Sequence, residues 1–186
     1  KPSIHSLVYY QQEMVMGFAT LVENKDDSTG GHIRRSSEYA LLIARNLKKK
    51  KKYKKIINRD YITNLSQAAP MHDIGKIGIP DVILQKPDKL TDDEYAIMKR
   101  HAEIGGKIIS ETFGHLLDAE YEDMAYNVAR HHHEKYNGKG YPDGLTGEEI
   151  PLSARIMAVA DVFDAVSAKR CYRDAMPLKK CYEIIL

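Results

Sequence analysis

The sequence predicts an all-α protein, a single helical domain of about seven helices built around a metal centre. Apolar residues recur at helical spacing along most of the chain, whereas alternating runs rich in β-branched residues, which are typical of strands, are missing. A length of 186 residues is enough for one domain with a sizeable core and short for two. Histidines and aspartates at the ends of several expected helices predict the metal centre.

The helical spacing places the expected helices, in chain order, at residues 5–24, 32–49, 54–72, 91–111, 117–133, 151–169 and 177–186. Thr91 and Glu94 predict a capping box that opens the fourth helix. Pro151 and Pro177 suit the first turns of the last two helices, because proline lacks an N–H group that a first turn leaves unpaired anyway. Three connecting loops are polar or rich in glycine and proline: 25–31, 74–90 and 134–150.

The composition excludes several classes of protein. With 43% hydrophobic and 29% charged residues the chain is an ordinary globular protein, and a net charge of +2 gives no general field for a nucleic acid polymer. The lysine run 48–52, extended by Lys54 and Lys55, is interpreted as a solvated helix end, with a nucleic acid or membrane surface as the alternative.

The cellular context follows from what the sequence lacks. Cys171 and Cys181 have no metal-type spacing and are expected to be reduced thiols. No apolar stretch reaches the roughly eighteen residues of a membrane span. We therefore expect a cytoplasmic domain covering residues 1–186, in which residues 1–22 form a leading helix that connects to an upstream sensor or receiver region. A membrane-bound parent protein stays open.

Candidate metal ligands recur in five places along the chain. His72 and Asp73 are adjacent at the end of an expected helix, so that an imidazole and a carboxylate reach one site. His101 lies at the spacing of neighbouring isoleucines, on an apolar helix face. Asp161 stands in an almost wholly apolar helix, where a carboxylate is costly unless it is paired or metal-bound. The remaining candidates end or begin expected helices: His32, His132 and His133.

Each candidate alone has a plain structural explanation, such as a satisfied core histidine at 101 or a solvated helix end at 131–134. Together the seven residues contain no cysteine and exceed what one tetrahedral zinc ion needs. A mixed set of this size suits two octahedral ions such as iron or manganese. Two ions bridged by a carboxylate and a hydroxide are a recurrent arrangement for in-line attack on phosphorus.

The motifs, in this order, resemble the HD-GYP family, a subgroup of the HD-domain phosphohydrolases. The resemblance runs from about Glu23 to the end of the chain, and Gly140-Tyr141-Pro142 is the naming tripeptide. The other segments that carry it are residues 29–35, 72–80, 98–101, 104–105, 132–134 and 161–165.

The resemblance implies an all-helical metal-dependent phosphodiesterase that hydrolyses the bacterial second messenger cyclic di-GMP. Asp73 matches a ligand that bridges two ions, and Lys76 matches the lysine that meets the scissile phosphate. The metal ligands carried over by position are His32, His72, Asp73, His101, His132, His133 and Asp161. The residues that match dinucleotide contacts are Tyr141, Asp164, Arg170 and Arg173. Surface charge for the arginines and loop packing for Tyr141 are the alternative interpretations.

One position departs from the family. Members with three metals carry a glutamate four residues before the first histidine, where this chain has Ser28. A serine hydroxyl is a poorer ligand for a hard cation than a carboxylate. We therefore expect two ions and mainly linear pGpG as product, with Asp26 and Asp27 as alternative carboxylates for a third ion and further cleavage to GMP.

Two other functions stay open. One is hydrolysis of a different nucleotide by the same kind of site, since a fold does not fix a substrate. The other is a signalling module that binds cyclic di-GMP with little catalysis and presents it to partner proteins. An intact ligand set favours the enzyme over the module. A homodimer is compatible with all three functions.

Overall fold

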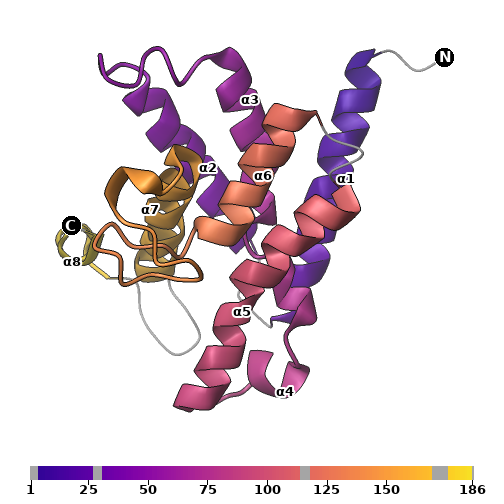
Figure 1. Ribbon diagram of the computed structural model, residues 1–186, viewed down its shortest axis with the longest axis vertical. Helices are drawn as coiled ribbons and strands as arrows, with labels where there is room; N and C mark the ends of the chain where they lie inside the picture. The colour runs from indigo at the N-terminus through magenta and orange to yellow at the C-terminus, as the bar shows by residue number, and fades with distance from the viewer. Residues whose placement is uncertain (1–3, 27–30, 114–117, 169–175, 186) are drawn as a thin grey trace.

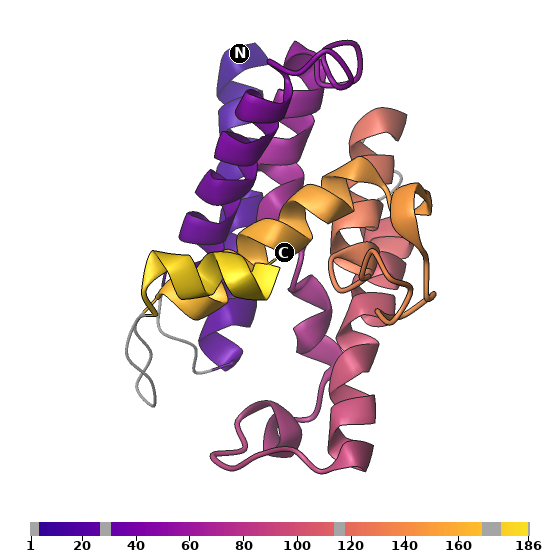
Figure 2. The same cartoon turned by 90° about the vertical axis from the view of Figure 1, so that its left-hand side faces the viewer.

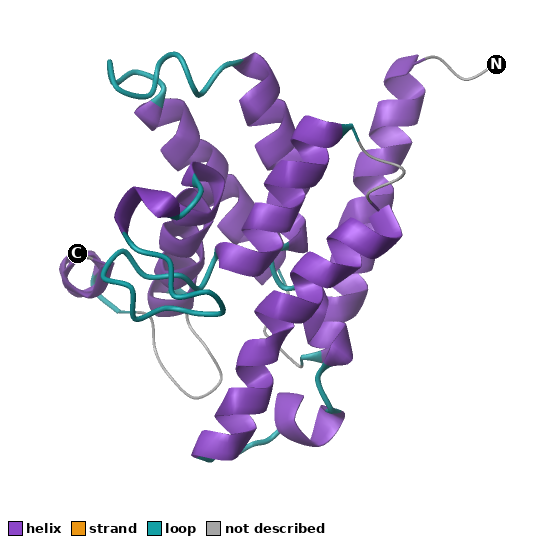
Figure 3. Ribbon diagram, viewed as in Figure 1, coloured by secondary structure: helices purple, strands orange, loops and turns teal. Residues whose placement is uncertain are grey.

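The structure is a computed structural model that describes residues 4–26, 31–113, 118–168 and 176–185 (Figure 1). Across these residues every regular element is a helix, and the only pairing of extended backbone is a single bridge between Asn137 and Thr146 (Figure 3). The predicted all-α fold is therefore confirmed. No helix in these ranges is long and apolar enough to span a membrane.

Eight α-helices and four shorter helical turns follow one another in the described residues. The α-helices are α1 (Ile4–Lys25), α2 (His32–Leu47), α3 (Arg59–Ala68), α4 (Asp81–Leu84), α5 (Asp92–Ile108), α6 (Ala119–His131), α7 (Leu152–Ser167) and α8 (Leu178–Ile185). The shorter turns are η1 (Ala69–Met71), η2 (Ile74–Gly78), η3 (Ile109–Phe113) and η4 (Gly147–Glu149).

The third expected helix is shorter than predicted at both ends. Asn58 caps α3, its side chain accepting a hydrogen bond from the backbone N–H of Tyr61 at 2.7 Å, so residues 54–58 are not part of it. The regular helix ends at Ala68, and Pro70 lies in the tighter turn η1. His72 and Asp73 consequently lie between two 3₁₀ turns rather than on a regular helix, which corrects the prediction.

Residues 74–90 are also not simply a loop. They contain η2 and α4, because Ile83 and Leu84 turn inward and pack with Met98 and Ile104 of α5. The capping box at Thr91 and Glu94 is present, with both of its hydrogen bonds. The lysine run after α2 lies in an exposed turn.

Small residues let the helices of the core approach closely. α2 packs against α7, and α6 packs against both α3 and α5. The side chains in these contacts include fully buried alanines: Ala40, Ala44, Ala125, Ala129, Ala154 and Ala160. Figure 2 shows α7 running between α2 on one side and α5 and α6 on the other. This crossing places the middle of α7 at the centre of the molecule, where the candidate ligands meet.

Candidate metal centre

Five separate parts of the chain supply the candidate ligands. His32 is the first residue of α2, His101 lies within α5 and Asp161 within α7. The 3₁₀ segment supplies His72 and Asp73, and the turn after α6 supplies the other two histidines. The structure brings all seven together in two groups, within each of which one ligand atom per residue lies within 4.8 Å of the others. The groups are Asp73, His101, His132 and His133, and His32, His72 and Asp161.

Asp73 lies between the two groups. Its Oδ1 is 3.5 Å from His101 Nε2 and 3.6 Å from His132 Nε2. Its other oxygen, Oδ2, is 3.6 Å from Nε2 of His72, which belongs to the second group. In that second group, Asp161 Oδ1 is 3.3 Å from His32 Nε2. Each oxygen of Asp73 thus faces a different group, as a bridging carboxylate would.

Three imidazoles present an unpaired nitrogen to this centre. The Nε2 atoms of His72, His101 and His132 are buried and have no hydrogen-bond partner among the described residues. Their Nδ1–H groups donate to backbone carbonyls instead, at 2.9 Å to Ala69, 2.7 Å to Met98 and 2.9 Å to Val128. Each carbonyl therefore fixes the tautomer that leaves a lone pair on Nε2. Buried polar atoms are costly without a partner, and a divalent cation is the partner that this donor set fits.

The protonation states of Asp73 and of three of the five candidate imidazoles also suit a cation, whereas His32 would have to lose a proton to bind one. Burial lowers the pKa of His101 to about 4 and lowers the pKa values of His72 and His133, so these rings are neutral at pH 7. The pKa of Asp73 is held well below its usual value by Lys76 and His72, although burial opposes the shift. Neutral imidazoles and ionised carboxylates are the forms that bind metal.

His32 is held by groups outside the two ligand groups. Its Nδ1 lies 2.7 Å from Asp164 Oδ2, and Arg35 donates to both oxygens of Asp164 at 2.7 and 3.1 Å. Burial acts to lower the pKa of His32, but the hydrogen bonds with Asp161 and Asp164 raise it to about 9. Asp164 is almost fully buried. Its expected contact with a dinucleotide stays a prediction, and its contacts here orient a candidate ligand.

Arg35 also belongs to the site, although it was not predicted from the sequence. It lies about one helical turn after His32 on α2. Because α2 packs against α7, its guanidinium group reaches Asp164 on α7, 2.7 Å from Nε to Oδ1. Because a histidine and an arginine three residues apart on a helix share one face, this spacing could have identified Arg35 from the sequence as a neighbour of His32.

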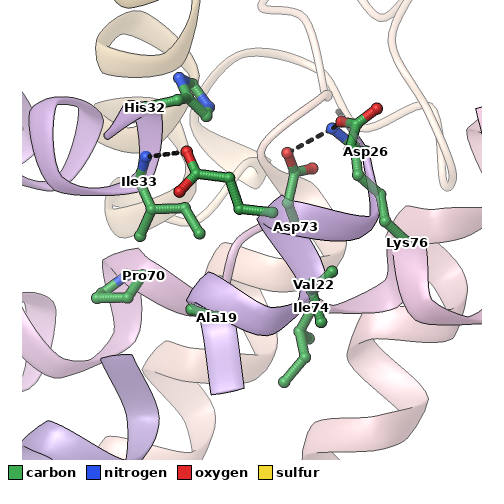
Figure 4. Close-up of a pocket in the computed structure, with 10 residues that line it drawn as sticks. Ala19, Val22, Asp26, His32, Ile33, Pro70, Asp73, Ile74 and Lys76 are labelled. Carbon is green, nitrogen blue, oxygen red and sulfur yellow. Dashed lines mark hydrogen bonds and ion pairs between the residues drawn. The ribbon is translucent and has the colours of Figure 1, made fainter. Parts of the chain in front are cut away.

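Lys76 lies at the edge of the centre. Its Nζ is 2.8 Å from Asp73 Oδ2 and 2.6 Å from Asp26 Oδ2. Figure 4 shows the side chains of Asp26, Asp73 and Lys76 converging at this edge. Burial opposes its charge, but Asp73 and Asp26 raise the pKa of Lys76 above its usual value. The ammonium group is therefore charged and lies beside Asp73 and a cavity of about 10 Å³ that Glu23 also lines.

Tyr141 covers the other side of the centre. Its ring is stacked on that of His133, with centroids 4.8 Å apart and planes at 29°. A cavity of about 650 Å³ begins at His132 and His133 and continues along α7 to α8, and its size suits a small organic ligand. Arg170 and Arg173, the other expected substrate contacts, lie outside the described residues, as does Ser28.

Comparisons with known proteins give one family and several named relatives. The model of the HD domain family matches residues 18–186. A cyclic di-GMP phosphodiesterase of Vibrio cholerae is 42% identical over 172 residues, which are 92% of this chain and 35% of the relative. The cyclic di-GMP phosphodiesterase response regulator RpfG of Xanthomonas campestris is 41% identical, over 93% of this chain and 42% of the relative.

A relative with a different named substrate is nearly as similar. The 3'3'-cGAMP-specific phosphodiesterase 2 of Vibrio cholerae is 41% identical, over 88% of this chain and 29% of the relative. A probable cyclic di-GMP phosphodiesterase of Vibrio cholerae is 43% identical, over 95% of this chain and 40% of the relative. The chain therefore spans less than half the length of each of these curated relatives.

Proposed function

The chain belongs to the HD domain family, in its HD-GYP subgroup, and from this premise we propose that it hydrolyses cyclic di-GMP to linear pGpG at a centre of two divalent metal ions. The observation that carries the proposal is the position of Asp73, whose two oxygens face two separate groups of buried histidines. Relatives named cyclic di-GMP phosphodiesterases, which match more than nine tenths of this chain, support the substrate.

The ligands divide between the two ions. Asp73 with His101, His132 and His133 would hold one ion, and His32, His72 and Asp161 with the second oxygen of Asp73 would hold the other. Imidazole and carboxylate without thiolate favour iron or manganese. Such a pair of ions polarises a phosphodiester and lowers the pKa of water, which is the chemistry that hydrolysis requires.

Lys76 would stabilise the negative charge that grows on the phosphate during hydrolysis. Its Nζ is already charged, and within the part of the chain that the structure describes it contacts the carboxylates of Asp73 and Asp26. When a phosphate oxygen enters beside Asp73, the ammonium group can exchange the contact with Asp26 for a contact with the substrate. A positive group fixed where charge develops is among the largest contributions to catalysis.

The proposed substrate contacts are one residue of the loop after α6 and two arginines that follow α7 in the sequence. Tyr141 presents a ring beside the centre, and we assign it, with Arg170 and Arg173, to binding of the dinucleotide. Arginine pairs with phosphate through two parallel hydrogen bonds. The similar relatives named for 3'3'-cGAMP make that dinucleotide the second candidate substrate.

The test combines metal analysis with a product assay on one sample. The protein is purified without oxygen, its iron and manganese are measured, and it is incubated with cyclic di-GMP or 3'3'-cGAMP. We expect two ions per chain, faster loss of cyclic di-GMP, and pGpG as the main product in timed chromatography. Protein with two bound ions and no turnover of either dinucleotide, but with tight binding of cyclic di-GMP, would support the signalling module instead.

The end product tests the departure at Ser28. A linear dinucleotide carries a terminal phosphate with additional negative charge, and a third cation would help to hold it. We expect slow conversion of pGpG to GMP for this reason. Three ions per chain and rapid formation of GMP would contradict it, and Asp26, which contacts Lys76, would be the first carboxylate to examine.

A further inference from the structure

Glu134 directly follows two candidate ligands, but its carboxylate is turned away from them into the loop of residues 135–146. Oε1 accepts hydrogen bonds from the backbone N–H groups of Asp143 and Gly144 at 2.7 and 3.1 Å. Oε2 accepts one from the N–H of Leu145 at 3.1 Å. The residue is only 4% exposed. A buried carboxylate with three backbone donors is a strong anchor, because charged hydrogen bonds are about twice as strong as neutral ones.

A second anchor holds the same loop from the end of α6. Arg130 donates to both oxygens of Asp143, at 2.7 and 2.8 Å, and His131 Nε2 lies 2.9 Å from Oδ2 of that carboxylate. The backbone of Asp143 is therefore bound by Glu134 while its side chain is bound by α6. Gly140 packs so closely on the backbone of Glu134 that a Cβ atom at this position would overlap with it.

The anchored loop carries Tyr141 onto His133. The backbone N–H of Tyr141 donates to the carbonyl oxygen of His133 at 3.3 Å, and the two rings are stacked. This stacking matters because, among the described residues, the His133 ring has no hydrogen bond of its own. The other four candidate histidines are each fixed through Nδ1, three by carbonyls and His32 by Asp164. The rings of His132 and His101 also lie against His133, with centroids 4.1 and 5.0 Å away, but at angles of 43° and 88°. The Tyr141 ring is the stacked contact that comes from outside the candidate ligands, and it closes the remaining side of the His133 ring.

We propose that Glu134 is a positioning residue for one of the two ions: it fixes the loop so that Tyr141 holds the His133 ring in the orientation for metal binding. The inference rests on the proposed function in one respect, namely that His133 is a ligand. It adds that the ion bound by Asp73, His101, His132 and His133 depends on the loop, whereas the ion bound by His32, His72 and Asp161 does not.

The first experiment is a calorimetric titration of Mn²⁺ into purified metal-depleted protein. Glu134→Gln keeps the size of the side chain but places an NH₂ group opposite the N–H of Leu145, so part of the anchor is lost. We expect one ion to bind as in the wild type and the other to bind roughly 10 to 100 times more weakly, as is common when a group that orients a ligand is removed. Glu120→Gln, which makes the same change at an exposed position of α6, should leave both affinities unchanged.

Tyr141 provides a second variant that keeps the anchor intact. Tyr141→Ala should weaken the binding of the same one Mn²⁺ ion as Glu134→Gln does. Tyr141→Phe, which keeps the ring, should bind both ions as tightly as the wild type. The double variant Glu134→Gln with Tyr141→Ala should be no worse than either single variant, because both act through the same ring. His133→Ala identifies which ion is affected.

Two outcomes would overturn the inference. One is wild-type affinity for both ions in Glu134→Gln and Tyr141→Ala. The other is equal weakening of both ions together with a lower melting temperature, which would mean general destabilisation. The proposed function fails separately, because wild-type protein that binds fewer than two ions contradicts the dinuclear centre whatever the variants do.

Discussion

At the scale of single residues, Asp73 is the side chain on which the centre most depends. We predict that Asp73→Ala removes both bound metal and hydrolysis, because each of its oxygens faces a different group of histidines. Metal content per chain should fall from two ions to one or none, and the rate by at least about 100-fold. Metal analysis and the cyclic di-GMP assay measure both effects. Asp88→Ala, at an exposed position, is the control, and a fully metallated, active Asp73→Ala protein would refute the bridging role.

Asp164 allows two roles to be separated at the same scale. If Asp164 orients His32, Asp164→Asn should weaken metal binding by roughly 10 to 100-fold. The affinity of the protein for cyclic di-GMP should stay unchanged. Titrations with Mn²⁺ and, separately, with the dinucleotide distinguish the two. The reverse pattern, with full metal content and weaker dinucleotide binding, would establish the direct substrate contact expected from the family resemblance. Arg35→Lys is an informative companion, because lysine cannot donate to both oxygens of Asp164 in the same way.

The candidate ligands could be nominated from sequence because each is a residue type that binds metal, placed where a helix begins or ends or in an apolar helix. The contacts of the residues that support these ligands could not be predicted, although Lys76 and Asp164 were themselves named from the family resemblance. Arg35 reaches Asp164 across 129 residues of chain, and Lys76 reaches Asp26 across 50. Contacts of this kind depend on how helices pack, which no local pattern contains. Glu134 is part of a family motif that the sequence shows, but the sequence could not predict that its carboxylate points into the following loop.

At the scale of elements, the fit of η2 against α5 positions Asp73 relative to His101. Gly75 is in direct contact with the backbone of α5, and a Cβ atom there would overlap with the carbonyl oxygen of His101 and the backbone of Gly105. Gly75→Ala should therefore push η2 away from α5 and destabilise the protein by about 1 to 3 kcal/mol. Thermal or urea unfolding measures the loss, and metal content should fall with it.

Gly17 is the matched control for that substitution. It lies inside α1, and nothing is within 4 Å of a Cβ atom built on it. Gly17→Ala should stabilise the protein by about 0.5 to 1 kcal/mol, because alanine is the better helix former. Equal effects of the two substitutions would show that the contact between η2 and α5 does not constrain the fold.

The elements that sequence predicted well are the long ones. α2, α5, α6 and α7 each repeat their apolar residues over several turns, and a repeated pattern identifies a helix. The 3₁₀ turns η1 and η2 and the four-residue α4 are too short to show any period. The start of α3 was missed because the cap at Asn58 was not recognised, and residues 54–58 were assigned to the helix.

At the scale of the whole molecule, the candidate metal centre joins α2, α5 and α7 with the segment between η1 and η2 and with the turn after α6. Ions that bind the folded chain and not the unfolded chain stabilise it, by about 2.7 kcal/mol at a concentration 100 times Kd. For a protein of this size each kcal/mol corresponds to roughly 2 to 4 °C in Tm. We predict that removal of metal by a chelator lowers Tm by roughly 5 to 10 °C. Scanning calorimetry with and without chelator measures the change, and Asp73→Ala, which already lacks at least one of the two ions, should show a smaller decrease than the wild type.

The division of the ligands into two groups has a consequence for how the centre is completed during synthesis. The ligands Asp73, His101, His132 and His133, together with the loop that orients His133, have all been synthesised once residue 146 has left the ribosome, whereas the other group waits for Asp161 in α7. One coordination site can therefore exist in a chain that still lacks α7, and the other cannot. The order of translation therefore separates two groups of candidate ligands that the finished protein brings to the two oxygens of Asp73.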